Sequence, residues 1–381
     1  MPVYLDHAAT SPLRPEALAA MLPVLTEHFG NPSGGHQVAR RARLALDEAR
    51  DDVARCLGCE PGEVVFTSGG TEADNLAVLG AHGARGGTVL CSSIEHHAVL
   101  HACAAAGGAT VPVLATGVID LDALVDALHP GVGLVSVMLA NNEVGTIQPI
   151  ADVAAAVRSR APGALFHTDA VAAVGWTDVA EAVGVADLVS LSAHKFGGPK
   201  GTGALVVRSG VSLAPVVHGG GQERERRPGT EHVAGVVGMA AALRVATAGW
   251  RAEAERVGAL RDRMADALRE AVPAVHETCA PGRGDGTADR SGKLANSCHL
   301  QVEGVEQEEL VVLLDEAGVC ASAGAACASG AVEPSHVLRA MGLGARQSRT
   351  ALRLTLGHST TAADVDLVLE VFPKVVERLR S

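Results

Sequence analysis

The chain has 381 residues, which is enough for one large domain and a smaller second domain around buried cores. Hydrophobic residues make up 48% of the sequence, a value that indicates a globular protein and excludes a disordered one. The formal net charge is -12, whereas binding to nucleic-acid phosphates needs clustered cations. We therefore expect no direct binding of nucleic acid.

The N-terminal sequence argues against secretion. Residues 1–7 lack the charged region and the apolar run of a signal peptide, and no apolar run is long enough to cross a membrane without charges, Gly or Pro. We expect no membrane partner and a cytoplasmic location, where structural disulfides are rare. Cys56 and Cys59 form one C-x-x-C motif, but no second pair follows at zinc-site spacing, so we expect no metal.

Short apolar runs alternate with helical patterns between about residues 60 and 210. Helical patterns occupy 121–128 and 150–160. The runs typical of buried strands are 64–67, 88–91, 134–138, 164–167, 187–190 and 204–207. This alternation predicts an α/β fold with a mostly parallel sheet, which binds ligands at the carboxyl ends of its strands.

A smaller C-terminal α/β domain is predicted after a long helical stretch at about 233–271 and an exposed Gly-, Asp- and Arg-rich loop at 280–293. The pattern then restarts with strands at 297–302 and 352–356 and helices at 306–317, 335–341 and 362–379. We assign residues 15–254 to a large domain, and residues 1–14 and 255–381 to a small domain.

Three segments carry chemistry at the expected strand ends. The first, Ser68–Glu72, follows a strand and opens a helix; Gly70 lets a ligand approach the backbone, and Thr71 adds a hydroxyl to the helix N-terminus. This pattern indicates a phosphate cradle. A glycine turn with a threonine cap would have the same sequence.

The second segment places Asp169 at the end of a buried strand, where a carboxylate is costly unless a cation pairs with it. The ring nitrogen of pyridoxal phosphate (PLP) is such a cation. A helix cap or a buried ion pair would explain the residue equally well.

The third segment, residues 190–201, holds two of the four lysines, Lys195 and Lys200. A lysine at the carboxyl edge of a sheet can be desolvated and form a Schiff base. Two surface lysines on a loop are the alternative.

The chain resembles the cysteine desulfurases of the class V aminotransferase group, which are PLP enzymes of fold type I. The resemblance runs nearly from end to end. Its motifs are Tyr4–Pro12, Asn31–Ser33, Phe66–Glu72, Ser93–Val99, Asn141–Pro149, Ser192–Lys195, Gly219–Arg224, Gly324–Cys327 and Leu352–Arg353. It implies PLP as cofactor and L-cysteine as substrate, with transfer of the substrate sulfur as a persulfide.

The resemblance also implies roles for single residues. Lys195 would form the Schiff base with PLP, and Asp169 would pair with its ring nitrogen. The residues implied to hold the phosphate are Gly70, Thr71, Ser192, His194 and, from a partner subunit, Thr230, which implies a homodimer.

Substrate and proton-transfer roles follow in the same way. Asn142 would contact the cofactor or the substrate, and Arg353 would grip the substrate carboxylate with its bidentate guanidinium. His96 would stack on the cofactor ring and transfer protons. Taken alone, His96 with His97 and His101 is also compatible with a metal cluster or with a helix cap.

Cys327 lies among small residues in 321–330, a composition that predicts a mobile thiol able to visit the cofactor and then an acceptor protein. An exposed incidental cysteine is the alternative. The loop resembles that of the longer-loop desulfurases, which pass sulfur readily to partner proteins.

Three departures from the family pattern stand at Ala172, where the family has Gln, at Gly324–Cys327 and at Arg227–Thr230. They are compatible with a specialised enzyme, such as the desulfurase of a bacterial DNA phosphorothioation system. Iron–sulfur assembly and tRNA thiolation are the other acceptor pathways. Rival interpretations are a different fold-type-I enzyme, such as an aminotransferase or selenocysteine lyase, and a non-catalytic iron–sulfur scaffold.

Overall fold

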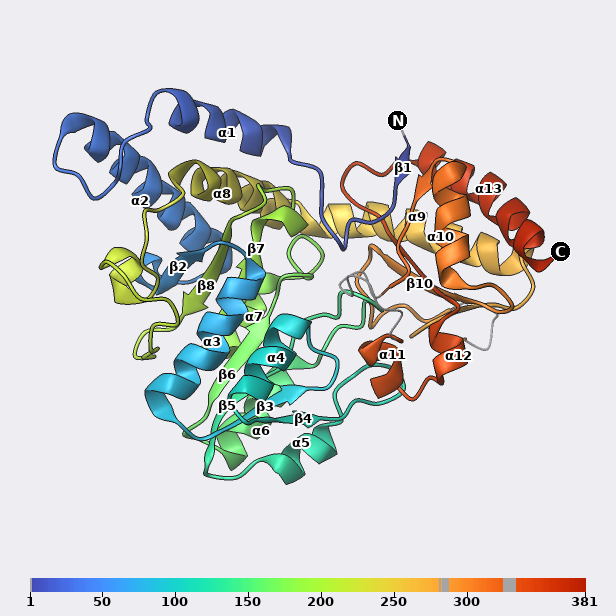
Figure 1. The fold of residues 1–381 in the computed structure, drawn as a ribbon, viewed down its shortest axis with the longest axis horizontal. Coiled ribbons are helices and arrows are strands. Elements are labelled where there is room, and N and C mark those ends of the chain that lie inside the picture. Colours follow the sequence, from blue (N-terminus) through green and yellow to red (C-terminus); the bar gives the residue numbers. More distant parts are fainter. Residues whose placement is uncertain (1, 281, 283–287, 325–333) are drawn as a thin grey trace.

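The computed structural model describes residues 2–280, 282, 288–324 and 334–381. Two α/β units lie side by side, and the N-terminal strand lies against the C-terminal part of the chain (Figure 1). Among the described residues, the larger unit is built on a seven-stranded sheet and the smaller one on a three-stranded sheet. The predicted α/β class is confirmed, and the domain boundaries at 14/15 and 254/255 stay predictions.

The large sheet is mostly parallel, with one antiparallel strand, β8, between β2 and β7. The neighbours β7, β6, β5, β3 and β4 all pair in parallel. The strand order is β2 (Val64–Thr67), β8 (Gly203–Val207), β7 (Leu188–Ser192), β6 (Leu165–Asp169), β5 (Val132–Ser136), β3 (Thr88–Ser92) and β4 (Ala109–Val111). The carboxyl ends of the parallel strands therefore share one edge.

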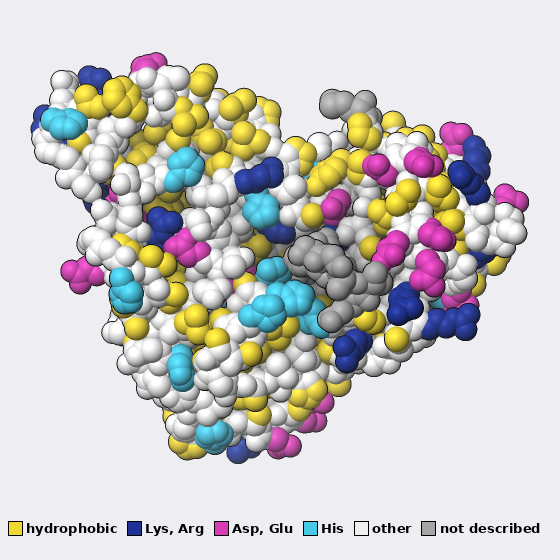
Figure 2. Space-filling view, in the orientation of Figure 1, with side chains coloured by type: hydrophobic (Ala, Val, Ile, Leu, Met, Phe, Trp, Pro, Cys, Tyr) yellow, Lys and Arg dark blue, Asp and Glu magenta, His cyan; other side chains and the backbone are white. Residues whose placement is uncertain are grey.

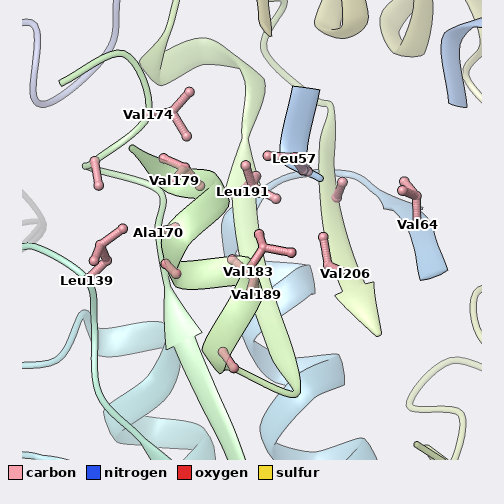
Figure 3. Close-up of a cluster of buried hydrophobic side chains, with 14 of the residues drawn as sticks. Leu57, Val64, Leu139, Ala170, Val174, Val179, Val183, Val189, Leu191 and Val206 are labelled. Carbon is pink, nitrogen blue, oxygen red and sulfur yellow. The ribbon is translucent and has the colours of Figure 1, made fainter. Parts of the chain in front are cut away.

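Alternate residues of these strands enter two different cores. Phe166 and Val189 point into one core, whereas Leu165 and Leu188 point into the other. The first core also holds valines and leucines of the helices (Figure 3). Because both faces are buried, the strands are apolar throughout, which makes them recognisable in the sequence.

Helices cover both faces of the large sheet. One face carries α3 (Gly70–Arg85) and α4 (His97–Ala105). The other face and its margin carry α1 (Pro15–Thr26), α2 (Gln37–Leu57), α5 (Leu121–Ala127), α6 (Ile150–Arg160), α7 (Val179–Val185) and α8 (Val233–Ala248). Three short 3-10 turns are η1 (Pro61–Glu63), η2 (Ala193–Lys195) and η3 (Gln222–Glu225).

The smaller unit packs helices on an antiparallel sheet in which β10 (Ser297–Val302) lies between β12 (Ala351–Thr355) and β9 (Val275–Glu277). Strand β1 (Val3–Tyr4) pairs in parallel with β11 (Val319–Cys320), so the N-terminus joins this unit. Its helices are α9 (Trp250–Ala271), α10 (Gln307–Glu316), α11 (His336–Ala340), α12 (Ala345–Ser348) and α13 (Ala362–Arg380).

The helical stretch predicted at 233–271 is not one continuous helix. Gly249 separates α8 from α9, and the two helix axes differ by 73°. This bend lets α8 stay in the core of the large sheet while α9 joins the core of the smaller unit. In the described part of the chain no single helix is long and apolar enough to span a membrane; the pair α8 and α9 has that length and composition only across this bend.

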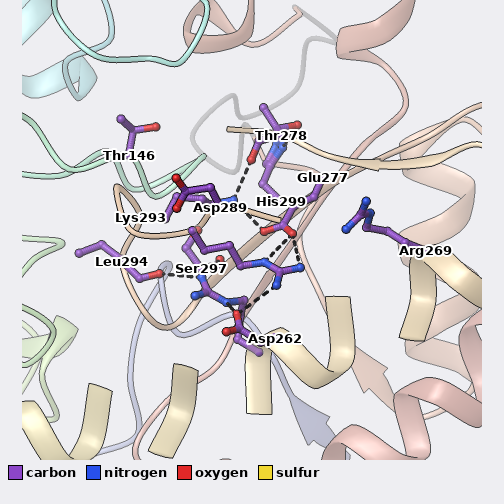
Figure 4. A network of polar contacts seen from close by, with 12 residues as sticks. Thr146, Asp262, Arg269, Glu277, Thr278, Asp289, Lys293, Leu294, Ser297 and His299 are labelled. Atoms are coloured by element: carbon purple, nitrogen blue, oxygen red, sulfur yellow. Dashed lines mark hydrogen bonds and ion pairs between the residues drawn. The ribbon is translucent and has the colours of Figure 1, made fainter. Parts of the chain in front are cut away.

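A buried ionic network fastens the smaller unit to the loop that follows β5 (Figure 4). Lys293 Nζ lies 3.1 Å from Glu277 Oε1, and both side chains are almost fully buried. The amide of Leu294 donates to the carbonyl oxygen of Gly145 at 2.8 Å. The network thereby fixes segment 293–297 beside the carboxyl edge of the large sheet.

Candidate active site

The predicted phosphate cradle lies between β2 and the N-terminus of α3. A cavity of about 350 Å³ is lined by Thr10, Ser68, Gly69, Gly70, Thr71, Glu72, Ser192, His194, Lys200 and Gly201. A Cβ on Gly70 would lie 2.8 Å from Val171 Cγ2, so a larger residue there would displace the Val171 side chain. The structure thus brings together four predicted phosphate ligands from two segments far apart in the sequence.

Thr230 lies elsewhere. It is exposed and does not line this cradle, although the family resemblance predicts that it serves a phosphate. A contribution from a second subunit is compatible with this placement.

Asp169 and Lys195 lie at the carboxyl ends of the neighbouring strands β6 and β7. Lys195 lies in η2, directly after β7, and its Nζ donates to the carbonyl oxygens of Ala8 and, at 3.0 Å, Ala9. Asp169 is the last residue of β6, and its Oδ1 accepts a hydrogen bond from the Val171 amide at 2.8 Å. The charge of Lys195 acts on Asp169, so the two side chains belong to one site.

Burial raises the pKa of Asp169 from 3.8 to about 6, although the Val171 amide and Lys195 both favour the charged carboxylate. A buried acid with one backbone donor has capacity for a further cationic partner. It is therefore suited to the protonated ring nitrogen of PLP.

We expect Asp169→Asn to stabilise the cofactor-free protein at neutral pH. In the wild type the folded state holds the Asp169 proton more tightly than the unfolded state, so stability falls as pH rises from about 4 to about 6. A pKa difference of about 2 corresponds to about 3 kcal/mol at pH 7.5, and to little at pH 4. Urea unfolding at both pH values measures the gain, with the exposed Asp122→Asn as control. A gain that is the same at both pH values would contradict this account.

His96 caps α4, and its Nδ1 accepts a hydrogen bond from the Ala98 amide at 3.2 Å. Burial and then the Lys195 charge lower the pKa of His96 to about 4, so the imidazole is neutral at pH 7. Several histidines gather on this face of the molecule (Figure 2). The rings of His97 and His336 pack at a tilt of 55° with 4.5 Å between their centroids, but within the described ranges no three His, Cys, Asp or Glu side chains are placed to hold a metal ion.

Arg353 lies on β12 with a buried guanidinium. Its Nη2 pairs with Asp6 Oδ1 at 2.7 Å, and its Nη1 lies 3.3 Å from the carbonyl oxygens of Asn142 and Gly324. Arg353 and Asn142 are therefore neighbours, as the family roles require. Protein groups already engage both terminal nitrogens, so a substrate carboxylate would compete with Asp6 for this guanidinium.

Cys327 lies outside the described residues. The described residues before and after it are anchored at the site: Gly324 accepts from Arg353, and His336 Nε2 lies 2.9 Å from the Glu95 carbonyl oxygen. The chain between them thus starts and ends beside the predicted substrate and cofactor residues.

Sequence reasoning missed a buried acidic layer behind Asp169. Asp74 of α3 and Glu95 are almost completely buried, and burial raises the pKa of each well above its ordinary value. Asp74 Oδ1 lies 3.7 Å from Nε2 of His167. The His167 ring is held by hydrogen bonds of its Nδ1 with Ser136 Oγ at 2.8 Å and of its Nε2 with Ser190 Oγ at 2.9 Å. Because neutral acids back the site, the negative charge there is concentrated on Asp169. Nothing in the helical pattern around Asp74 signals its burial.

The described residues fit PLP. The free amide groups at the N-terminus of the 16-residue helix α3, with Thr71, Ser192 and His194, suit a phosphate. Asp169 suits the ring nitrogen, and Lys195 is the amine within its electrostatic reach. Ala172 lines a small pocket with Asn142 and Lys195. Position 172, where the family has Gln, therefore offers no side-chain amide to the cofactor.

A family model, aminotransferase class-V, matches residues 3–368. The chain belongs to this family. It is 43% identical over 387 residues to "Cysteine desulfurase IscS" of Methanosarcina thermophila, covering 100% of this chain and 93% of the relative. The fold-type-I assignment made from the sequence is thereby confirmed.

Solved structures agree with this class-V assignment. A NifS-like protein superposes with a TM-score of 0.91 at 33% identity, covering 99% of this chain and 100% of that one. SspA in complex with cysteine superposes with a TM-score of 0.77 at 31% identity, covering 94% and 99%.

Proposed function

We propose that this class-V protein takes sulfur from L-cysteine, holds it as a persulfide on Cys327 and passes it to an acceptor protein. The protein is a PLP-dependent cysteine desulfurase, in keeping with its full-length relatives. One observation carries the assignment: the phosphate cradle, Asp169 and Lys195 meet at one edge of the sheet. The reaction balances without an external oxidant, because L-cysteine and a thiol become L-alanine and a persulfide.

The cofactor-holding residues act by charge and hydrogen bonding. Gly70, Thr71, Ser192 and His194 would hold the phosphate, and Asp169 would keep the ring nitrogen protonated. When bound, PLP supplies an electron sink for charge that develops at the substrate Cα. Lys195 would be the covalent attachment point, and its amine would also serve as the base for the proton on that carbon.

Sulfur capture falls to Cys327. Its thiolate would attack the substrate sulfur, forming an S–S bond as the C–S bond breaks. A thiol has an ordinary pKa of about 8.5, so a neutral base must take its proton. The family resemblance assigns this proton transfer to His96, whose imidazole is neutral at pH 7 because burial lowers its pKa to about 4.

Homodimer formation is supported by an apolar face of α1. This helix buries Ala17 and Val24 against the core, whereas Leu18, Leu22 and Leu25 on its other face are each more than half exposed. A second copy of the chain would cover this face. It would place its own Thr230 near the phosphate cradle of the first copy, which the first copy's Thr230 does not line. We infer a homodimer that completes both phosphate sites.

We expect Leu22→Asp to weaken the dimer by at least about 10-fold, because a charge would enter an apolar interface. Light scattering after gel filtration measures the effect, and the PLP dissociation constant should rise in parallel. Leu114→Asp, at an exposed leucine between β4 and α5, is the matched control. Equal masses for both variants and the wild type would place the interface elsewhere.

The acceptor is proposed to be a protein. The net charge of -12 disfavours transfer directly onto DNA or tRNA. Participation in DNA phosphorothioation stays a prediction, as do iron–sulfur assembly and tRNA thiolation.

The test is the release of L-alanine from L-cysteine by the PLP-loaded protein with a reductant. We expect stoichiometric alanine and sulfide. Alanine from selenocysteine alone would favour a selenocysteine lyase, transfer of the amino group to a keto acid would favour an aminotransferase, and a protein that binds iron and sulfide without turnover would be a scaffold.

A further inference from the structure

Two cavities flank Lys195 and share a wall. The inner pocket, of about 20 Å³, includes Asn142 and Ala172, and the outer cavity, of about 220 Å³, lies at the bend between α8 and α9. His7, Trp176 and Lys195 line both. The side chain of His7 therefore stands between the predicted reaction site and a much larger cavity.

The His7 ring is buried, although it carries two polar nitrogens. The residue is 4% exposed, yet neither Nδ1 nor Nε2 has a hydrogen-bond partner among the described residues. Leaving two buried ring nitrogens unpaired is costly, so they need water as a partner. The inner pocket has room for about one water and the outer cavity for several.

The position of the ring is fixed by packing. A Cβ on Gly357 would lie 2.0 Å from His7 Nδ1, so glycine is required for the ring to fit against that backbone. The rings of Tyr4 and His358 lie 5.1 and 6.1 Å away. His7 is thus held between the two cavities and has no space to swing away from them.

Burial, more than the surrounding charges, keeps His7 neutral. Burial and then His358 lower the pKa of His7 to about 4. The charged groups that line the cavities beside it are Lys195, Arg14 and Glu253, and the oxygens of Glu253 are engaged by Arg256 at 2.8 and 3.2 Å. A neutral imidazole has one donor and one acceptor nitrogen, which is the state needed to pass a proton on.

The proposed reaction needs such a transfer. Carbon C3 carries two hydrogens in L-cysteine and three in L-alanine, so one proton must reach the enclosed site in each turnover. Lys195 Nζ is bonded to the carbonyl oxygens of Ala8 and Ala9, the residues that follow His7. His7 therefore belongs to the short segment that holds Lys195 Nζ at the inner pocket.

We propose that His7 relays protons between the outer cavity and the inner pocket during desulfuration. One ring nitrogen takes a proton from water in the outer cavity while the other releases its proton to the water of the inner pocket. Exchange of the two tautomers resets the ring, so no electron and no net charge is stored. This relay rests on the proposed function and adds His7 to its proton path.

The decisive experiment removes the ring and then returns it in solution. In the PLP-loaded enzyme, His7→Ala should lower kcat by on the order of 10²-fold with little change in KM, as for loss of a positioned proton-transfer group. Added imidazole should restore much of the rate, because the space it needs is continuous with the outer cavity. The deuterium content at C3 of alanine made in an equal mixture of H₂O and D₂O should also change.

Two further variants separate relay from packing. His7→Gln keeps a donor and an acceptor but cannot relay, so it should be as slow as His7→Ala and should decide the matter if His7→Ala does not fold. Val245→Ala, at a residue that lines only the outer cavity, should stay within about 2-fold of the wild type, as expected for a residue outside the proton path.

A His7→Gln enzyme at the wild-type rate would overturn the relay, and so would a folded His7→Ala enzyme that imidazole does not rescue. If the wild type itself makes no alanine, the proposed function fails and not the relay alone.

Discussion

Lys195→Ala should abolish covalent attachment of PLP and lower alanine formation by on the order of 10³-fold or more, because the change removes both the amine and a proton-transfer group. The ammonium lies at the carboxyl edge of the sheet, held by the carbonyl oxygens of Ala8 and Ala9. Its charge also lowers the pKa values of His96 and His194, after the effect of burial. Reduction of the loaded protein with borohydride followed by peptide mass analysis shows the attachment site directly.

Lys200→Ala is the matched control for that experiment. Lys200 lies five residues further on, is exposed and lines the phosphate cradle. Its loss should weaken PLP binding but leave the covalent attachment in place. If the modified peptide carried PLP on Lys200, or if Lys195→Ala retained the attachment, the assignment of Lys195 would be wrong.

The sheet and the cofactor half of the site could be predicted from the sequence for one physical reason. Strands buried on both faces are apolar throughout, so the ends of β6 and β7 are visible in the sequence to within about two residues. Because parallel strands bring their carboxyl ends to one edge, the sequence alone predicts that Asp169 and Lys195 lie together.

Other parts of the site depend on contacts between segments that are distant in the chain. The pairing of Arg353 with Asp6 joins residues 347 positions apart, and nothing local to either residue announces it. The burial of Asp74 and the position of His7 between two cavities are likewise results of packing. The break at Gly249 is not predicted because only one glycine separates two helical sequences, and the separate cores of the two units explain the bend.

Cys327→Ala should remove persulfide formation and lower alanine production by at least about 10²-fold, since the enzyme would lose its sulfur nucleophile. The residue lies outside the described part of the structure. Gly324 before it is bonded to Arg353, however, and His336 after it is bonded to the backbone of Glu95.

Mass spectrometry of the protein after one turnover without reductant measures the gain of one sulfur atom. Cys320→Ser is the matched control, because Cys320 is the nearest described cysteine and lies on β11 beside Asp315, at 3.6 Å from its Oδ1. Burial and then Asp315 raise the pKa of that thiol, which makes it a poor nucleophile at neutral pH. Cys320→Ser should therefore keep the persulfide and the rate. Equal alanine release by Cys327→Ala and the wild type would show that sulfur leaves without a protein carrier, and a lyase would replace the desulfurase mechanism.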